Sequence, residues 1–192
     1  SEKLRVLFFK PTEFFKKIKA ETDLKVSVKW AFASLVAYSI LSVLTWLILG
    51  SLSITLPEWM GTVTGDYLTV AFALITVLLS FIFLLPMSRY FHWIALKLGG
   101  KGTQDDTTKI LFYSEVVSFS GGWIPIITWF FSLWGIYTMY RGYRVLHSLS
   151  RGRAIGAILL PVLLILLVIL AILITIILGI LAMVIGFQAA TG

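Results

Sequence analysis

Glu115 is the one acidic side chain that lies deep inside a long apolar segment of this chain. It occurs in the stretch KILFYSEVVSFS, with hydroxyl groups beside it on Ser114 and Ser118. A carboxyl group in a membrane segment is costly, and such groups commonly mark functional sites. We therefore expect one of two roles. Glu115 is either a protonated side chain hydrogen-bonded to neighbouring helices or a proton- or cation-responsive group in a polar cavity.

The polar residues expected around Glu115 come from two other apolar segments. A glycine pair at residues 121–122 predicts a turn that brings Thr128 and Ser132 level with Glu115. Tyr38 and Ser42 share one helical face, and a stripe of hydroxyl and small residues favours close helix contact in membranes. The candidate intramembrane polar site is therefore Glu115, Thr128, Ser132, Tyr38 and Ser42.

Other kinds of site have few candidate groups in this sequence. The chain contains no cysteine, which excludes disulfides and thiolate ligands. His92 and His147 are the two imidazoles, and we expect them to be packing residues because no further ligands accompany them. The glycines around Lys101 lack the spacing of a phosphate-binding loop and the hydroxyl residue after its lysine. We predict no catalytic, cofactor or metal site, and a protein that is not an enzyme.

Composition places the chain in a membrane. Hydrophobic residues make up 59% of the 192 residues, and the mean hydropathy is +0.97. Soluble domains are roughly 45 to 50% apolar. The net charge is +7, yet the basic residues form short clusters between apolar runs rather than a nucleic-acid patch. We predict an all-α, polytopic integral membrane protein that binds no nucleic acid.

Five apolar segments are predicted to be transmembrane helices. They cover residues 28–50, 67–88, 104–120, 123–143 and 155–187, and together form a domain over residues 28–192. The third is roughly 25 Å long, which is short for a hydrocarbon core of about 30 Å. Pro86 is expected to kink or end the second helix, and Gly99 to stop its continuation. Thr103 and Asp106 have capping-box spacing for the start of the third.

Charge predicts the orientation of these segments. The 16 lysines and arginines lie before the first segment, between the second and third, or between the fourth and fifth. The positive-inside rule then places the N-terminus in the cytoplasm and the C-terminus outside. A re-entrant loop over residues 104–122 would separate the following four arginines from the other basic residues, so we predict five crossings.

The N-terminal segment, residues 1–27, is basic and amphipathic. Pro11 suits the first turn of a helix whose apolar residues share one face, with lysines on the other. We expect an interfacial helix with a membrane-surface site at Phe14, Phe15, Lys16, Lys17, Ile18 and Lys19. The alternative is a solvated basic tail. A second candidate surface is a cytosolic collar of Arg89, His92, Arg141, Arg144 and His147.

Four stretches of the sequence resemble one known family. They are KPTEFFKKI, HWIALKLGGKGT, KILFYSEV and RGYRVLHSLSRGRAIGAILLPVLL, and together they span most of the chain. They are similar to the Yip domain family, the Ypt/Rab-interacting proteins with five membrane spans, in its prokaryotic branch. Eukaryotic members of this fold are linked to Rab GTPases and vesicle traffic, so the resemblance implies a membrane-embedded adaptor.

Two function classes remain open on sequence alone. The first is a non-enzymatic membrane scaffold or adaptor that recruits partners or shapes the bilayer. The second is a small transporter or channel organised around Glu115. Transporters usually show inverted repeats, and the five unequal segments show none, which favours the scaffold. We expect the lipid bilayer as a partner, and leave open a protein partner on the cytosolic face and a homo-oligomer.

Overall fold

The computed structural model describes residues 2–21, 23–51, 67–124 and 127–191, and the regular structure in these ranges is entirely α-helical. The helices are α1 (Glu2–Phe9), α2 (Pro11–Ile18), α3 (Leu24–Ser51), α4 (Tyr67–Lys97), α5 (Gln104–Gly122), α6 (Thr128–Leu146) and α7 (Arg151–Thr191). The predicted all-α class is thus confirmed for the described residues. The connector between the first two predicted spans, and Pro125, lie outside these ranges.

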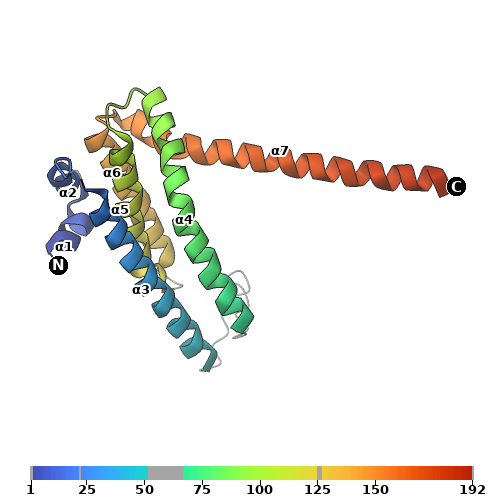
Figure 1. Cartoon of the computed structure of the whole chain (residues 1–192), viewed down its shortest axis with the longest axis horizontal. Coiled ribbons are helices and arrows are strands. Elements are labelled where there is room, and N and C mark those ends of the chain that lie inside the picture. The colour runs from blue at the N-terminus through green and yellow to red at the C-terminus, as the bar shows by residue number, and fades with distance from the viewer. Residues whose placement is uncertain (1, 22, 52–66, 125–126, 192) are drawn as a thin grey trace.

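The centre of the molecule is an antiparallel hairpin of α5 and α6, with α3 and α4 packed against α5 (Figure 1). Glycines of α6 let the helices approach closely. A Cβ added at Gly135 would lie 2.2 Å from the Ser118 hydroxyl oxygen, and one at Gly142 would lie 2.8 Å from the Ile110 side chain. Val116 and Val117 are fully buried. The helix of the predicted segment 123–143 is α6, which begins later than predicted, at Thr128.

The two N-terminal helices are part of this bundle. Phe14, Phe15 and Ile18 are at most 5% exposed, and the Phe14 ring meets the Tyr113 ring edge-on at a centroid distance of 4.7 Å. The Lys109 ammonium group donates a hydrogen bond to the Glu21 backbone carbonyl. The apolar face that we expected in the lipid headgroups is thus covered by protein, because rings of α5 and α6 offer an equally apolar surface.

The exposed face of α2 keeps its charge. Lys16, Lys17 and Lys19 are solvent-exposed, whereas the apolar residues of the same helix are buried. Binding of this segment to the membrane surface stays a prediction, and it now depends on these lysines rather than on inserted phenylalanines.

Local signals for helix ends agree with the sequence. Thr103 and Asp106 form a complete capping box: the Thr103 side chain accepts from the Asp106 amide, and the Asp106 carboxylate accepts from the Thr103 amide at 2.8 Å. The stop after α4 is Gly99, whose φ of 86° lies in the left-handed region that favours glycine. Pro86 lies inside α4, so it does not end that helix.

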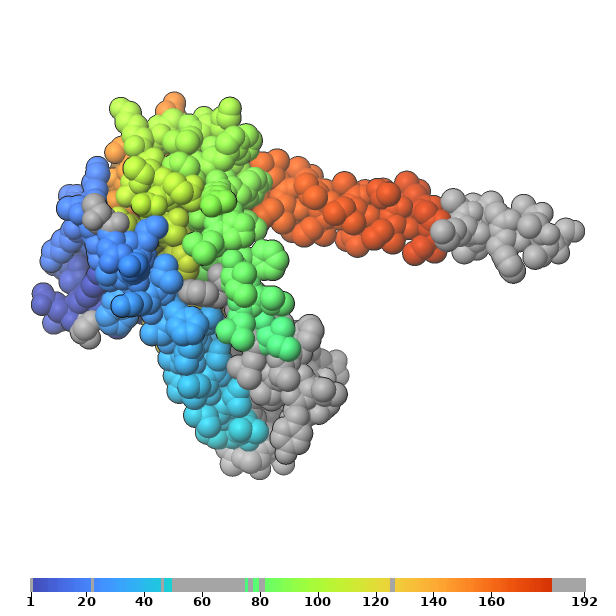
Figure 2. Space-filling view, in the orientation of Figure 1, coloured from blue at the N-terminus to red at the C-terminus, as the bar shows by residue number. Residues whose placement is uncertain are grey.

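Two of the described helices are long and apolar enough to cross a membrane, judged by length and composition: α3 over Leu24–Leu49 and α7 over Arg151–Ile180. The five predicted crossings are therefore not established. Helix α7 runs away from the bundle, across the direction of α3 and α4 (Figure 1). Figure 2 shows it projecting free of the other helices over most of its length, and its apolar side chains from Leu159 to Ile180 are largely exposed.

Candidate functional site

A polar cavity surrounds Glu115 between α3, α5 and α6. Its volume is about 350 Å³, and it has both polar and apolar walls. The residues that line it are Tyr38 from α3, Ser114, Glu115, Ser118, Phe119 and Gly122 from α5, and Thr128, Ser132, Gly135, Ile136 and Met139 from α6. The structure thus brings together four of the five residues predicted for the intramembrane polar site. Ser42 is absent from the lining, and its hydroxyl oxygen is buried without a hydrogen-bond partner among the described residues.

Helical spacing explains why these side chains converge. Glu115, Ser118 and Gly122 recur at intervals of three and four along α5, and Ser132, Gly135 and Met139 do so along α6. Small residues on the facing stripes let the helices approach and leave space beside them. Gly135 has no side chain to fill the gap opposite Ser118, and a methyl group there would have to displace the Ser118 hydroxyl and would lie 3.1 Å from the Ser114 carbonyl oxygen.

Within the described residues, the Glu115 carboxyl group has no hydrogen bond and no ion pair. The nearby hydroxyl groups are committed elsewhere. Ser114 donates to the Ile110 carbonyl at 2.7 Å, and Ser118 donates to the Ser114 carbonyl at 3.2 Å. Glu115 therefore faces an open polar space rather than a closed hydrogen-bonded contact. Such a cavity can accept a proton, a small cation or an ammonium group.

A second polar cluster joins α4, α5 and the end of α6 at the other end of the hairpin. The Thr107 hydroxyl oxygen lies 3.0 Å from Nδ1 of His92 and 2.8 Å from Nε2 of His147. His147 is fully buried, and its Nδ1 has no hydrogen-bond partner in the described part of the chain. The backbone at Gly100 and Gly102 covers its ring, since a Cβ at either position would lie 2.9 Å from it.

The two imidazoles are held in their neutral forms. Burial and, to a smaller extent, the neighbouring His92 lower the pKa of His147 to about 4, while Asp106 opposes the shift. Burial also lowers the pKa of His92, again against the attraction of Asp106. These groups are therefore neutral imidazoles packed between helices at neutral pH. The described residues contain no group of three or more His, Cys, Asp or Glu side chains placed to hold a metal ion.

The predicted cytosolic collar does not form one cluster. Arg89 is exposed on α4, whereas the Arg141 guanidinium Nε donates to the Thr12 hydroxyl oxygen at 2.5 Å and lies over the Tyr137 ring. The buried Nε of Arg144 has no hydrogen-bond partner within the described ranges. Arg141 thus serves the contact between α6 and the N-terminal helices, and the two histidines join α4, α5 and the end of α6 through Thr107.

Sequence reasoning missed two of the residues that organise these sites. Thr107 bridges histidines that are 15 and 40 positions away in the chain, and nothing local to it signals that role. Trp134 donates its indole N–H to the Phe8 carbonyl at 3.0 Å, which fixes α1 on the hairpin. A signal for the second was present, because an indole inside a membrane segment needs an acceptor for its N–H.

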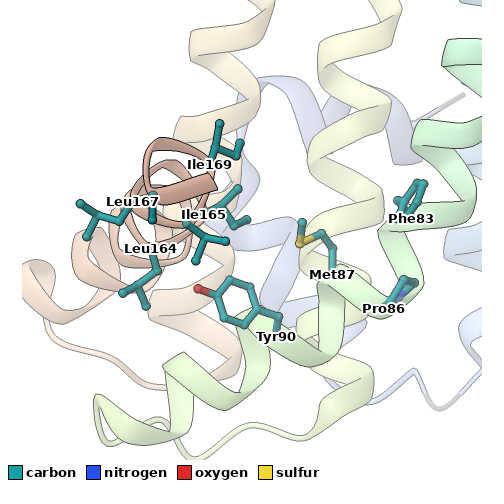
Figure 3. Close-up of a pocket in the computed structure, with 10 residues that line it drawn as sticks. Phe83, Pro86, Met87, Tyr90, Leu164, Ile165, Leu167 and Ile169 are labelled. Carbon is teal, nitrogen blue, oxygen red and sulfur yellow. The ribbon is translucent and has the colours of Figure 1, made fainter. Parts of the chain in front are cut away.

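An apolar cavity of about 620 Å³ lies in the corner between α4 and α7. Figure 3 shows Leu164, Ile165 and Ile169 of α7 facing Met87 and Tyr90 of α4. The Tyr90 hydroxyl donates to the Pro161 carbonyl at 3.4 Å, so it is already used within the protein. This corner therefore lacks the polar groups that would orient a specific ligand.

Comparison with known proteins gives one result. The family model described as the Yip1 domain matches residues 4–173. No curated protein and no solved structure matches the chain.

Proposed function

Because this chain belongs to the Yip1 domain family, we propose that it is a membrane scaffold or adaptor that holds partners at the cytosolic face of the bilayer. The family is made up of membrane proteins and is not known as an enzyme family. The one-sided distribution of the 16 basic residues supports a cytoplasmic N-terminus and an external C-terminus.

The observation that carries this proposal is the fixed basic surface of α2. Buried Phe14, Phe15 and Ile18 hold the helix against the hairpin, so Lys16 and Lys17 project from a defined place. A preorganised charged surface binds an acidic partner with less loss of conformational entropy than a solvated tail would. Acidic protein segments and anionic lipid headgroups are the partners that such a surface attracts.

Photocrosslinking from α2 tests the adaptor function. A photoreactive amino acid at Lys16 or Lys17 in the full chain, activated in the native membrane, is expected to give a discrete protein adduct. The same amino acid at Leu133, which is 65% exposed on the hairpin, is the control and should react with lipid. Absence of any protein adduct from both lysine positions would contradict recruitment of a protein partner.

The cavity around Glu115 favours a second candidate function, a transporter or channel. Under the scaffold proposal, proteoliposomes that carry the wild type or Glu115→Gln should show the same background leak of protons and monovalent cations. Glutamine keeps the shape of the side chain and removes its ability to ionise, so it separates charge from packing. Ion flux through the wild type that Glu115→Gln abolishes would replace the scaffold with the transporter.

A further inference from the structure

The turn between α5 and α6 lies beside the middle of α3. The ring centroids of Tyr38 and Phe119 are 5.3 Å apart, and a Cβ added at Gly122 would lie 3.4 Å from the Tyr38 ring. Tyr38 is within one turn of the midpoint of the apolar stretch Leu24–Leu49. In Figure 1, α3 and α4 continue well beyond the end of the hairpin. The hairpin therefore reaches only part of the depth that α3 spans.

Helix lengths give the scale of this difference. From Tyr38 to Ser51, α3 continues for roughly 20 Å past the turn at a rise of 1.5 Å per residue. The hydrocarbon core of a bilayer is about 30 Å thick. If α3 crosses it, the turn lies near the midplane, and the apolar part of α5 from Ile110 to Gly122, roughly 18 Å long, fits one leaflet.

The N-terminal helices exclude a deeper position for the hairpin. Trp134, bonded to the Phe8 carbonyl, is roughly 9 Å from the start of α6 at Thr128. With the turn at the outer surface, the exposed Lys10–Glu13 pair next to Phe8 would lie far inside the hydrocarbon. With the turn at the midplane, the same pair lies near the cytoplasmic boundary, where long charged side chains reach the headgroups.

The turn itself is built for an apolar surrounding. The Trp123 indole N–H donates to the Ser120 carbonyl at 3.1 Å, and the Ser120 hydroxyl donates to the Val116 carbonyl at 2.6 Å. The amide of Ile124 donates to the Gly121 carbonyl, and those of Ile127 and Thr128 donate to the Ile124 carbonyl. Donors inside a bilayer must be satisfied within the protein, and these are.

We propose that α5 and α6 form a re-entrant hairpin that enters the cytoplasmic leaflet, turns near the bilayer midplane and returns, which makes the protein a wedge in one leaflet. Because both helices take part, Arg141 and Arg144 return to the cytoplasmic side. All 16 basic residues therefore stay on that side without five crossings. The cavity of Glu115, roughly 10 Å from the turn, then belongs to the cytoplasmic leaflet.

A wedge follows from the number of helices at each depth. The cytoplasmic half of the bilayer holds α5 and α6 beside α3 and α4, with α1 and α2 packed on the hairpin. Beyond the turn, α3 and α4 continue without the hairpin (Figure 1). Added area in one leaflet favours curvature in which that leaflet lies on the convex side of the bilayer. This bending activity rests on the proposed scaffold function, whereas the depth of the hairpin does not.

Depth-dependent quenching tests the hairpin directly, and the absence of native cysteine makes single labels specific. Bimane is attached at Ser120→Cys beside the turn, or at the separate position Ile127→Cys, and the full chain is reconstituted. Leu47→Cys, near the far end of α3, and Lys101→Cys, before α5, calibrate shallow positions. We expect nitroxides deep in the acyl chains to quench residues 120 and 127 most, and headgroup nitroxides to quench residue 47 most. Strongest quenching of 120 and 127 by headgroup nitroxides would overturn the re-entrant hairpin.

The bending activity has its own measurement. Labelled protein is reconstituted in giant vesicles with its cytoplasmic side outward, and a narrow membrane tether is pulled. We expect a higher protein density on the tether than on the vesicle, and a lower one when the orientation is reversed. Equal densities would overturn the wedge. Absence of a protein adduct from both Lys16 and Lys17 would contradict the adaptor function but would change neither the depth of the hairpin nor the protein density on the tether, so the proposals fail separately.

Discussion

Replacement of Phe15 by alanine is expected to lower the free energy of unfolding by about 3 to 5 kcal/mol, the usual cost of removing a buried aromatic ring. Phe15 has no exposed surface, and its ring lies 3.0 Å from the position that a Cβ would take on Gly142. The cavity left behind cannot be closed by the glycine that faces it. Thermal unfolding of the full chain in detergent, followed by tryptophan fluorescence, measures the change.

Phe9→Ala is the matched control for this experiment. Phe9 occupies the end of the neighbouring helix α1 and is 78% exposed, so its replacement should change the stability in detergent little. If Phe15→Ala and Phe9→Ala had equal and small effects, α2 would not be docked on the hairpin, and the fixed basic surface proposed above would be lost with it.

Acidification is expected to destabilise the protein through His147. The unfolded chain binds the imidazole proton near pH 6.5, whereas the folded chain binds it only near pH 4. Between these values the unfolded state holds more protons, so stability is complete above the upper value and falls as pH is lowered toward the lower one. The full loss is about 3 kcal/mol, at 1.36 kcal/mol for each unit of pKa.

His147→Gln isolates this contribution because it removes the titration and keeps a polar partner for Thr107. The difference in stability between wild type and variant should vary with pH between 4 and 6.5, since every other titratable group is the same in both proteins. His92→Gln should change the slope less, because His92 is only half-buried. A difference that is constant across this range would show that His147 does not titrate on unfolding.

Local patterns in the sequence predict the structure correctly where the interactions that form it lie within one helical turn. The spacing of Thr103 and Asp106 predicts a capping box, and the structure contains it, since both hydrogen bonds form within one turn. The glycine after α4 likewise predicts a helix stop. Glycine adopts left-handed backbone geometry without the steric cost that other residue types meet there. The convergence of Glu115, Thr128 and Ser132 follows from helical spacing once the turn is placed.

Other features depend on what surrounds a segment, which periodicity does not report. The apolar face of Phe14, Phe15 and Ile18 predicts burial, yet lipid and protein cover such a face equally well. Helix α1 is held by the Trp134 indole, which lies 126 positions along the chain from Phe8, and a contact at that separation leaves no local signal in α1 itself. The sequence also does not predict the depth of the α5–α6 turn. The 16 basic residues lie on the cytoplasmic side both when α5 and α6 cross the bilayer and when they form a hairpin that returns.

The docking of α2 also imposes an order of events during synthesis. Phe14 leaves the ribosome 99 residues before Tyr113, the ring on which it finally rests. At about 5 to 20 residues per second, roughly 5 to 20 s pass between the synthesis of Phe14 and that of Tyr113. During that interval the membrane surface is the nearest apolar environment for these side chains of the nascent chain. The same lysines that flank this face would hold it at the headgroups until α5 and α6 arrive.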